Sequence, residues 1–294
     1  MRELVGEFAQ SVNPFSLLLA NARRSGKAAH IVGVHDCASA RVAEQAGFGA
    51  VWVSSLGLAV VSGKCDRNEL GWTETVNSVE AIAESVSIPV VLDADEGFGD
   101  KNIARVFLAR ASARGAACVS LEDKTFPKKN SFAEGVSLCE IPDFVEKLEA
   151  CRKVLDPSQT ALVARTDSLV AGEGIDRALE RAHAYAASGV DGLIIHSKSK
   201  SIDELAEFML RWDGDCPIIA IPTSYDDTDA KRFDELGVAC VIWANQLLRS
   251  SIAAMEGIAA DMMAGQNVGS LKGRMVSVNT ALHYADCRLG CSQG

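Results

Sequence analysis

Eight short apolar runs recur along the chain, with room for one helix between each run and the next. They lie at 30–34, 50–54, 89–93, 117–121, 161–164, 192–195, 217–221 and 240–244. Continuous rather than alternating hydrophobicity is typical of strands that are buried on both faces of a parallel sheet. The segments between the runs, such as 176–188, 202–211 and 230–236, have the spacing of amphipathic helices, and several helical segments end in glycine.

Eight strand–helix units without an internal break predict a closed (β/α)₈ barrel of the TIM type, built as a single domain over residues 1–294. An open, doubly wound sheet is the alternative that this periodicity leaves. Two helical segments fall outside the eight units. We expect the segment 15–25 to cover the bottom of the barrel. The segment 272–288, in a C-terminal helical extension at about 270–294, has no obvious place on the same barrel.

Composition and charge narrow the classes of function. The net charge of −10 argues against a nucleic-acid partner, which would need a basic face. No apolar run is long enough to cross a membrane or to form the core of a signal peptide. The nine cysteines are odd in number and scattered, which predicts reduced thiols in a cytoplasmic protein. Cys287 and Cys291 could ligate a metal, but no second pair accompanies them, and we interpret both as structural or incidental.

Polar residues end seven of the eight apolar runs. They are Ser54-Ser55, Asp93 with Asp95, Glu122-Asp123, Arg165-Thr166-Asp167, His196-Ser197-Lys198, Thr223-Ser224 and Asn245-Gln246. In a barrel these ends converge on one rim, where active sites lie. A single polar exit is ordinary, because every strand must leave the core somewhere. Seven exits that mix acids, an arginine and a histidine predict a functional rim that binds a small molecule.

Four acidic residues of this rim predict a metal site. Asp93 and Asp95 are two apart in a segment that we expect to be extended, so we expect both side chains to point to the same side. Glu122 ends the neighbouring strand, and Asp66 lies on the loop after the second strand. Carboxylates this close raise one another's pKa unless a cation neutralises them, and oxygen ligands favour Mg²⁺ or Mn²⁺ over zinc. A helix cap and a solvated loop would explain one of these acids, but hardly three together.

Arg165 and His196 form the cationic half of the predicted site. Arginine presents a planar fork that suits carboxylate or phosphate oxygens. His196 follows four mostly apolar residues, so a packed core histidine is the alternative reading. The polar stretch after Glu122 continues into a long loop, about 124–138, and long loops on the catalytic rim of a barrel are often lids. Such a lid would bring a lysine and two hydrogen-bonding groups to an anion: Lys128, Asn130 and Ser131.

Three stretches carry a resemblance to a known group of enzymes: Asp93-Ala94-Asp95-x-Gly97-Phe98-Gly99, Glu122-Asp123-Lys124 with Lys128-x-Asn130-Ser131, and Ala164-Arg165. In them the chain resembles the phosphoenolpyruvate mutase/isocitrate lyase superfamily, and within it the mutase family. The Lys-x-Asn-Ser stretch is the most specific, because it resembles the gating loop of the mutases. Val53 and Ser55 stand where mutases usually have glycine, and Thr166-Asp167 looks more like the lyases.

The resemblance implies the interconversion of phosphoenolpyruvate and 3-phosphonopyruvate, the step that creates the C–P bond of phosphonates. It implies that Mg²⁺, or Mn²⁺ in its place, is held by Asp93, Asp95 and Glu122. It implies that the pocket is lined, with backbone N–H groups on the substrate carboxylate, by Trp52, Ser54, Ser55 and Leu56. It implies that the phosphoryl group is gripped by Arg165, His196, Asn130 and Ser131. Asp66 would accept or position the phosphoryl group, and Lys128 would help to close the site.

Three other functions compete with this one. Phosphonopyruvate hydrolase shares the fold, the metal and nearly all of the loop, but tends to have threonine at the position of Asn130. A C–C lyase of the isocitrate or methylisocitrate type carries a catalytic cysteine in a Lys-x-Cys-Gly-His segment, and the loop from Glu122 to Ser131 has neither cysteine nor histidine. A barrel that only binds or scaffolds would not need the acid cluster.

The resemblance also implies an assembly and a moving lid. In this superfamily the last helix packs on a neighbouring subunit, so we expect a homo-oligomer, most simply a tetramer that is a dimer of helix-exchanging dimers. We expect the 124–138 loop to be mobile in the empty enzyme, because its polar sequence offers little apolar surface to hold it.

Overall fold

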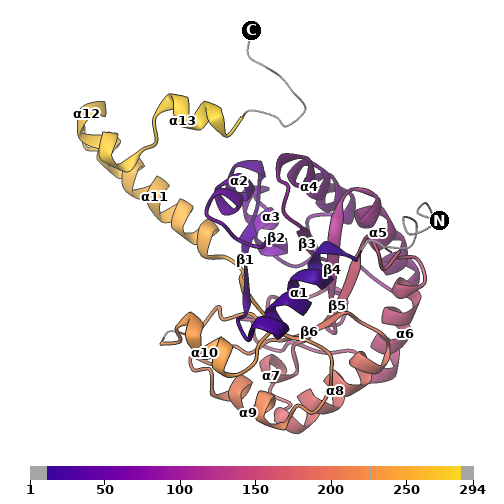
Figure 1. Cartoon of the computed structure of the whole chain (residues 1–294). Helices are drawn as coiled ribbons and strands as arrows, with labels where there is room; N and C mark the ends of the chain where they lie inside the picture. The colour runs from indigo at the N-terminus through magenta and orange to yellow at the C-terminus, as the bar shows by residue number, and fades with distance from the viewer. Residues whose placement is uncertain (1–11, 226, 286–294) are drawn as a thin grey trace, which may run out of the picture.

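Eight parallel strands close into one barrel in chain order, so that β8 pairs with β1 (Figure 1). The structure, a computed structural model, describes residues 12–225 and 227–285. The strands are β1 (Ala29–Val34), β2 (Ala50–Val53), β3 (Val90–Asp93), β4 (Ala116–Glu122), β5 (Ala161–Thr166), β6 (Gly192–Ile195), β7 (Ile218–Ala220) and β8 (Cys240–Trp243). All eight predicted runs therefore form strands. The predicted TIM-type barrel is confirmed, and the doubly wound alternative is wrong.

Helices follow the strands and surround most of the barrel (Figure 1). They are α1 (Pro14–Ser25), α2 (Cys37–Gln45), α3 (Ser55–Val61), α4 (Trp72–Ser85), α5 (Lys101–Ala113), α6 (Ile141–Arg152), α7 (Ser168–Ala171), α8 (Ile175–Ala187), α9 (Asp203–Arg211), α10 (Ala230–Glu235), α11 (Gln246–Met263), α12 (Val268–Leu271) and α13 (Val278–His283). The predicted helical segments 176–188, 202–211 and 230–236 correspond to α8, α9 and α10.

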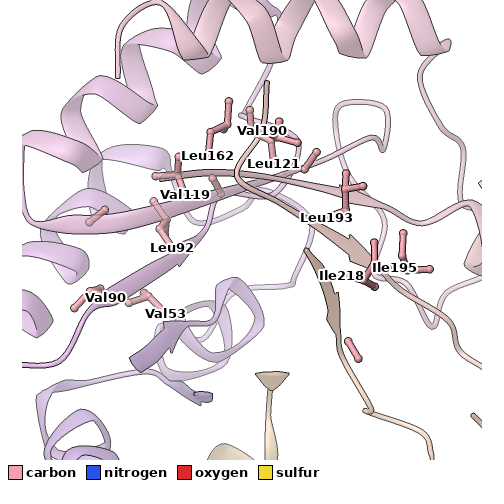
Figure 2. Close-up of a cluster of buried hydrophobic side chains, with 14 of the residues drawn as sticks. Val53, Val90, Leu92, Val119, Leu121, Leu162, Val190, Leu193, Ile195 and Ile218 are labelled. Carbon is pink, nitrogen blue, oxygen red and sulfur yellow. The ribbon is translucent and has the colours of Figure 1, made fainter. Parts of the chain in front are cut away.

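Alternate residues of each strand face two separate apolar layers. Figure 2 shows outward-facing side chains, among them Val90 and Leu92 of β3, in the layer between the strands and the surrounding helices. The residue between them, Val91, belongs to the second layer, which fills the inside of the barrel. Asp93 follows in the same alternation and so points inward, at the carboxyl end of its strand.

Helix α1 closes the amino end of the barrel, as predicted. Its Phe15 and Leu19 side chains are 1% exposed and pack with the inward-facing residues of the strands. Asn13 caps the helix by accepting hydrogen bonds from the N–H groups of Phe15 and Ser16. The Asn13 amide also donates to the carbonyl oxygen of Ala117 at 2.9 Å, which ties the helix to β4. The bottom of the barrel is thus sealed, and the opposite end alone is left for a site.

The C-terminal region leaves the barrel (Figure 1). Helix α11 runs outward, and Leu248 is its one buried residue. The helix predicted over 272–288 is confirmed only in α13: a short 3₁₀ turn at Lys272–Arg274 is followed by extended backbone, α13 then starts afresh, and residues 286–288 lie outside the described residues. The Ser277 side chain accepts a hydrogen bond from the N–H of Thr280, and a serine cap of this kind begins a new helix. Cys287 and Cys291 lie outside the described residues.

Among the helices of residues 12–225 and 227–285, none is long and apolar enough to cross a membrane.

Candidate active site

A cavity at the carboxyl ends of the strands collects every residue that the sequence predicts for the site. Its walls include Trp52, Ser54, Ser55, Leu56, Asp66, Asp93, Asp95, Glu122, Lys128, Asn130, Ser131, Arg165 and His196. They come from the ends of β2 to β6 and from two loops. We call this space the inner cavity.

A tight turn after β3 places Asp95. Asp95 has a φ of 50°, in the left-handed region, so the segment is not extended as predicted; both aspartates nevertheless line the cavity, because the turn folds the chain back over the strand end. Gly97 has a φ of 91°, and a Cβ there would lie 2.7 Å from the Cβ of Ala104. A glycine at position 97 is therefore required by the turn that presents Asp95.

Two residues that the sequence did not single out support this turn. Glu96 is completely buried and accepts hydrogen bonds from the N–H of Phe98 at 2.9 Å and from the amide of Asn68 at 3.2 Å. Asn68 in turn accepts a hydrogen bond from the N–H of Lys128 at 2.7 Å. Asn68 therefore links the turn that carries Asp95 to the long loop. Its position in an irregular segment gave no pattern by which to find it.

Lys128 is the central cation among the acids. Its Nζ lies 2.7 Å from Asp66 Oδ1 and 2.5 Å from Asp95 Oδ1, and the side chain is only 5% exposed. It also donates to Ser55 Oγ at 2.9 Å, and Ser55 donates to Asp93 Oδ2 at 3.0 Å. One ammonium group thus partly compensates three carboxylates, directly or through a serine.

The pKa values of two of these acids are raised, chiefly by burial. Burial, with the carboxylates of Asp93 and Glu122 nearby, raises the pKa of Asp95 well above its usual value, although Lys128 opposes the shift. Burial also raises the pKa of Asp93. For Asp66, burial is outweighed by Lys128 and by hydrogen bonds from Lys128 and Asn130, so that its pKa is lowered. The site around Asp93 and Asp95 would accept more positive charge than Lys128 supplies.

Arg165 and His196 form a second charged group with Asp167. Arg165 Nε lies 2.8 Å from Asp167 Oδ1, and its Nη2 donates to Ser131 Oγ at 2.9 Å. The same Nη2 lies 2.7 Å from His196 Nδ1. Lys124 completes the group, with its Nζ 3.0 Å from Glu122 Oε2 and 2.9 Å from Asp167 Oδ2. The pKa of Asp167 is accordingly lowered well below its usual value, because these cations outweigh its burial.

His196 is a neutral hydrogen-bond donor toward the cavity. Burial, together with the positive charge of Arg165, lowers its pKa. Nδ1 faces both Arg165 Nη2 at 2.7 Å and Asp167 Oδ1 at 3.1 Å. Because the shorter contact is to a group that can only donate, we assign Nδ1 as the acceptor and place the ring proton on Nε2. Nε2 is buried and has no partner among the described residues. An unpaired buried donor in a cavity fits an anionic ligand better than it fits a packed core histidine.

The long loop folds over the cavity as the predicted lid. Its ends are held together by a bridge between Lys124 and Leu138 and by a hydrogen bond from the N–H of Thr125 to the carbonyl oxygen of Ser137 at 3.0 Å. Near its tip, Asn130 Nδ2 donates to Asp66 Oδ2 at 2.6 Å. Phe132 is 53% exposed, so polar contacts and ion pairs rather than apolar burial hold the lid down.

The residues present fit a divalent cation that is bound by oxygen atoms. In the described part of the chain, no three acidic, histidine or cysteine side chains already form a metal-ligand set. The Lys128 ammonium instead lies between Asp66 and Asp95. Glu122 Oε1 is buried and has no hydrogen-bond partner among the described residues, and the pKa values of Asp93 and Asp95 are raised. A bound hard cation would give the Glu122 oxygen a partner and would favour the ionised forms of both aspartates.

Further wall residues come from places that the sequence marked but that we did not assign to the site. They are Lys124, Phe132, Ile221, Thr223, Ala244 and Asn245. Lys124 and Asn245 directly follow strand ends or stand two residues beyond them, as Asp167 does after β5. The sequence marks all three residues at or just after strand ends, but we gave none of them a role in the site.

With this geometry in view, the comparison with known proteins is decisive at the level of the family. The sequence profile of phosphoenolpyruvate phosphomutases matches residues 19–263. The chain belongs to this family. It is 40% identical to a phosphoenolpyruvate phosphomutase of Streptomyces hygroscopicus over 233 residues, 79% of this chain and 74% of that protein. The predicted phosphoenolpyruvate mutase/isocitrate lyase superfamily is thereby confirmed.

Solved structures agree with the phosphomutase family assignment. The crystal structure of a phosphoenolpyruvate phosphomutase from Streptomyces platensis subsp. rosaceus superposes with a TM-score of 0.87 at 33% identity, over 92% of this chain and 94% of that one. Phosphonopyruvate hydrolase in complex with oxalate and Mg²⁺ superposes with a TM-score of 0.85 at 30% identity, over 93% and 95%. Both activities therefore occur on closely similar barrels.

Proposed function

We propose that this chain is a phosphoenolpyruvate mutase, which interconverts phosphoenolpyruvate and 3-phosphonopyruvate with Mg²⁺, or with Mn²⁺ in its place. The observation that carries the proposal is the lid: Lys128, Asn130 and Ser131 reach three different parts of the inner cavity and close it. Lys128 meets Asp95, Asn130 meets Asp66, and Ser131 meets Asp167 at 2.6 Å. A cavity covered by such a lid suits a phosphoryl transfer from which water must be kept out.

The two halves of the cavity suit the two halves of the substrate. Arg165, the Nε2–H of His196 and the lid residue Asn130 offer donors to phosphoryl oxygens. On the other side, Trp52 and the first turn of α3 form a wall in which the N–H groups at Ser55 and Leu56 precede the first helical hydrogen bond. These N–H groups are placed to bind the carboxylate of the pyruvyl fragment.

The residues that would hold Mg²⁺ are Asp93, Asp95 and Glu122. When bound, Mg²⁺ would supply positive charge to the oxygens of the pyruvyl fragment and keep that fragment in place. Lys128 must then give up part of its contact with Asp95, because the ammonium group and a dication compete for the same carboxylate. Ser55, which donates to Asp93, keeps that side chain turned toward the site.

In the proposed reaction the phosphoryl group moves from one end of a bound enolate to the other. The C–P bond of phosphonopyruvate breaks as the O–P bond of phosphoenolpyruvate forms, and no proton or water is consumed. Arg165 and His196 hold the phosphoryl oxygens, and such preorganised donors stabilise a loose, metaphosphate-like transition state. Asp66, kept ionised by Lys128 and Asn130, lies where it can position the group in transit or accept it.

Asn130 is the feature that favours a mutase over a phosphonopyruvate hydrolase. Its amide is held by Asp66, and its Oδ1 accepts a hydrogen bond from the N–H of Phe132 at 3.0 Å, so the side chain spans the lid and the cavity. Threonine, which tends to occupy this position in hydrolases, has one short hydroxyl in place of the separate amide donor and carbonyl acceptor, and could not make the same bridge. A water molecule would then find room beside Asp66.

We also propose a homo-oligomer, a tetramer of two helix-exchanging dimers. Beyond Leu248, α11 exposes apolar side chains, including Met255 at 61% and Met263 at 88%. Exposed apolar surface of this kind marks an interface. Light scattering of the full chain should give a mass near four subunits. A stable monomer would contradict this assembly.

The function is tested by ³¹P NMR of the purified protein with phosphonopyruvate and Mg²⁺. We expect the phosphonate signal to be replaced by that of phosphoenolpyruvate. Free phosphate with pyruvate would instead identify a hydrolase, and no change at all would exclude both.

A further inference from the structure

A second pocket lies outside the inner cavity, at the mouth of the barrel. It is lined by Phe132, Lys198, Lys200, Thr223, Ser224, Asn245 and Arg249. These residues come from the lid, from the loops after β6 and β7, and from the first turn of α11. Phe132, Thr223 and Asn245 line both spaces, so the two adjoin. We call it the outer pocket.

Phe132 stands between the two spaces. Its ring makes an edge contact with the ring of His196, with centroids 6.4 Å apart, while half of the side chain faces solvent. A molecule in the outer pocket is thus one aromatic ring away from the Nε2–H donor of His196. Movement of the lid would displace Phe132 and join the pockets.

The three basic residues of the outer pocket have no counter-charge. Lys198, Lys200 and Arg249 are all exposed, and over residues 12–225 and 227–285 their side chains make neither an ion pair nor a hydrogen bond. Among the described residues, no acidic side chain lines the pocket. Three cations without an ion-pair partner around one hollow contrast with the net charge of −10 of the whole chain, which at long range opposes the approach of an anion.

The inner cavity cannot supply that attraction itself. Its three permanent cations, Lys124, Lys128 and Arg165, are paired with a larger number of carboxylates: Asp66, Asp93, Asp95, Glu122 and Asp167. With three positive and five negative formal charges, this group has a net charge of −2, and one bound dication would only bring it to neutrality. A substrate that carries a carboxylate and a phosphoryl or phosphonyl group, with roughly two charges on the latter, gains little from it at long range.

We propose that Lys198, Lys200 and Arg249 form an outer anion-binding site, which captures the phosphoryl or phosphonyl group of the substrate before the lid closes over it. The proposal rests on the proposed function for the identity of the ligand, a small organic phosphate or phosphonate. The outer site raises the rate of association, because unscreened cations at a cleft steer anions toward it. It takes no part in the chemical step.

The test is the association rate constant of phosphonopyruvate in the presence of Mg²⁺, followed by stopped-flow tryptophan fluorescence, to which Trp52 in the cavity wall contributes. The variant Lys198→Ala/Lys200→Ala/Arg249→Ala should associate about tenfold more slowly at low salt, and its rate should depend little on ionic strength between about 20 and about 200 mM. The wild-type rate should fall steeply over the same range. In turnover, kcat/KM should fall with the association rate, while kcat changes little.

Two matched variants separate charge from other effects. Lys27→Ala/Arg105→Ala/Lys153→Ala removes the same net charge from exposed side chains outside the pocket, and it should retain the wild-type rate and salt dependence. Lys198→Arg/Lys200→Arg/Arg249→Lys keeps the charges and should also associate rapidly. Thermal unfolding of each variant checks that the barrel is intact.

An outer-pocket variant with the wild-type association rate and salt slope would overturn the proposal, as would an equal loss in the control variant. The proposed function fails separately. If wild-type enzyme released phosphate and pyruvate, the mutase assignment would fall, whereas the association rates would still decide whether the outer pocket captures the anion.

Discussion

Lys128 and Lys198 lie on the same rim of the barrel, yet their surroundings are opposite. Lys128 is 5% exposed, and two carboxylates lie within 2.7 Å of its ammonium group. Lys198 is exposed, and no acid of the described residues pairs with it. The same contrast holds between the inner cavity and the outer pocket as wholes: buried charges are matched one against another, while exposed charges at the mouth are left uncompensated.

The difference follows from desolvation. A buried charge is tolerated only with partners, so each member of the inner group holds the others in place, and removing one leaves an opposite charge unpaired. An exposed charge keeps its water and acts on its surroundings at a distance, until salt screens it. Substitutions in the inner cavity should therefore reduce activity severely. Substitutions in the outer pocket should reduce it mildly, and by an amount that depends on the salt concentration.

The largest expected effect is the loss of the metal site. Asp93→Ala removes one proposed ligand and leaves Ser55 without its acceptor, so activity should fall by about 10³-fold or more, as for a group on which the whole transition state depends. Treatment with EDTA should abolish activity, and Mg²⁺ or Mn²⁺ should restore it. The exposed carboxylate variant Asp213→Ala is the control. Full activity in metal-free protein would end the metal assignment.

The next effect concerns the lid. Asn130→Ala removes one preorganised donor and should lower kcat by roughly 10²-fold. Asn130→Thr should also raise the ratio of free phosphate to phosphoenolpyruvate, measured by ³¹P NMR. Lys129→Ala, which changes the neighbouring exposed side chain, should leave both quantities near the wild-type values. Wild-type kcat and KM in Asn130→Ala would remove both the lid assignment and the preference for a mutase.

A third effect is on stability and its pH dependence. Burial raises the pKa of Asp123 from 3.8 to about 6, although it accepts hydrogen bonds from Thr166 and Tyr185. The folded state thus binds this proton more tightly than the unfolded state. Its contribution to the free energy of unfolding is full below pH 4 and is lost as the pH rises through about 6, on the order of 3 kcal/mol in all.

The asparagine of Asp123→Asn cannot titrate. The free energy of unfolding of the wild type, measured relative to that of the variant, should therefore decrease as the pH rises from about 4 to about 7. Urea unfolding at several pH values measures it. The exposed variant Asp213→Ala should show no such change. A difference that stays constant across this range would mean that Asp123 does not titrate there.

The smallest effect is that of a single outer cation. Arg249→Ala should lower kcat/KM by about two- to threefold at low salt and by less at high salt, since each exposed charge contributes only part of the steering field. Arg105→Ala on α5 is the matched control. A loss in Arg249→Ala that salt leaves unchanged would point to a direct contact rather than to steering.

The sequence predicted best what depends on neighbours in the chain. The eight strands follow from continuous apolar runs, and residues such as Arg165 and His196 were found because they stand where those runs end. The same logic missed Asn68, which reaches Glu96 and Lys128 from an irregular loop. No local pattern records a bridge between residues that are 28 and 60 positions apart.

The hydrophobic pattern also failed to predict the backbone conformation at Asp95 and the helix boundaries in the C-terminal region. Asp95 was expected on extended backbone, but the glycines that follow allow a reversal, and the residue adopts a left-handed conformation. The helix expected over 272–288 breaks before α13, because Ser277 caps a new helix. In both places a few turn-forming residues outweighed the longer periodic pattern.

The central claim is that the closed inner cavity passes a phosphoryl group between two positions of one substrate while water is excluded. It is tested most directly by converting phosphonopyruvate in H₂¹⁸O and observing the products by ³¹P NMR, in which each ¹⁸O on phosphorus shifts the signal. The account predicts phosphoenolpyruvate without ¹⁸O in its non-bridging phosphoryl oxygens, and no labelled phosphate. Free phosphate that carries one ¹⁸O would show that water reaches the group in transit, and would contradict the account.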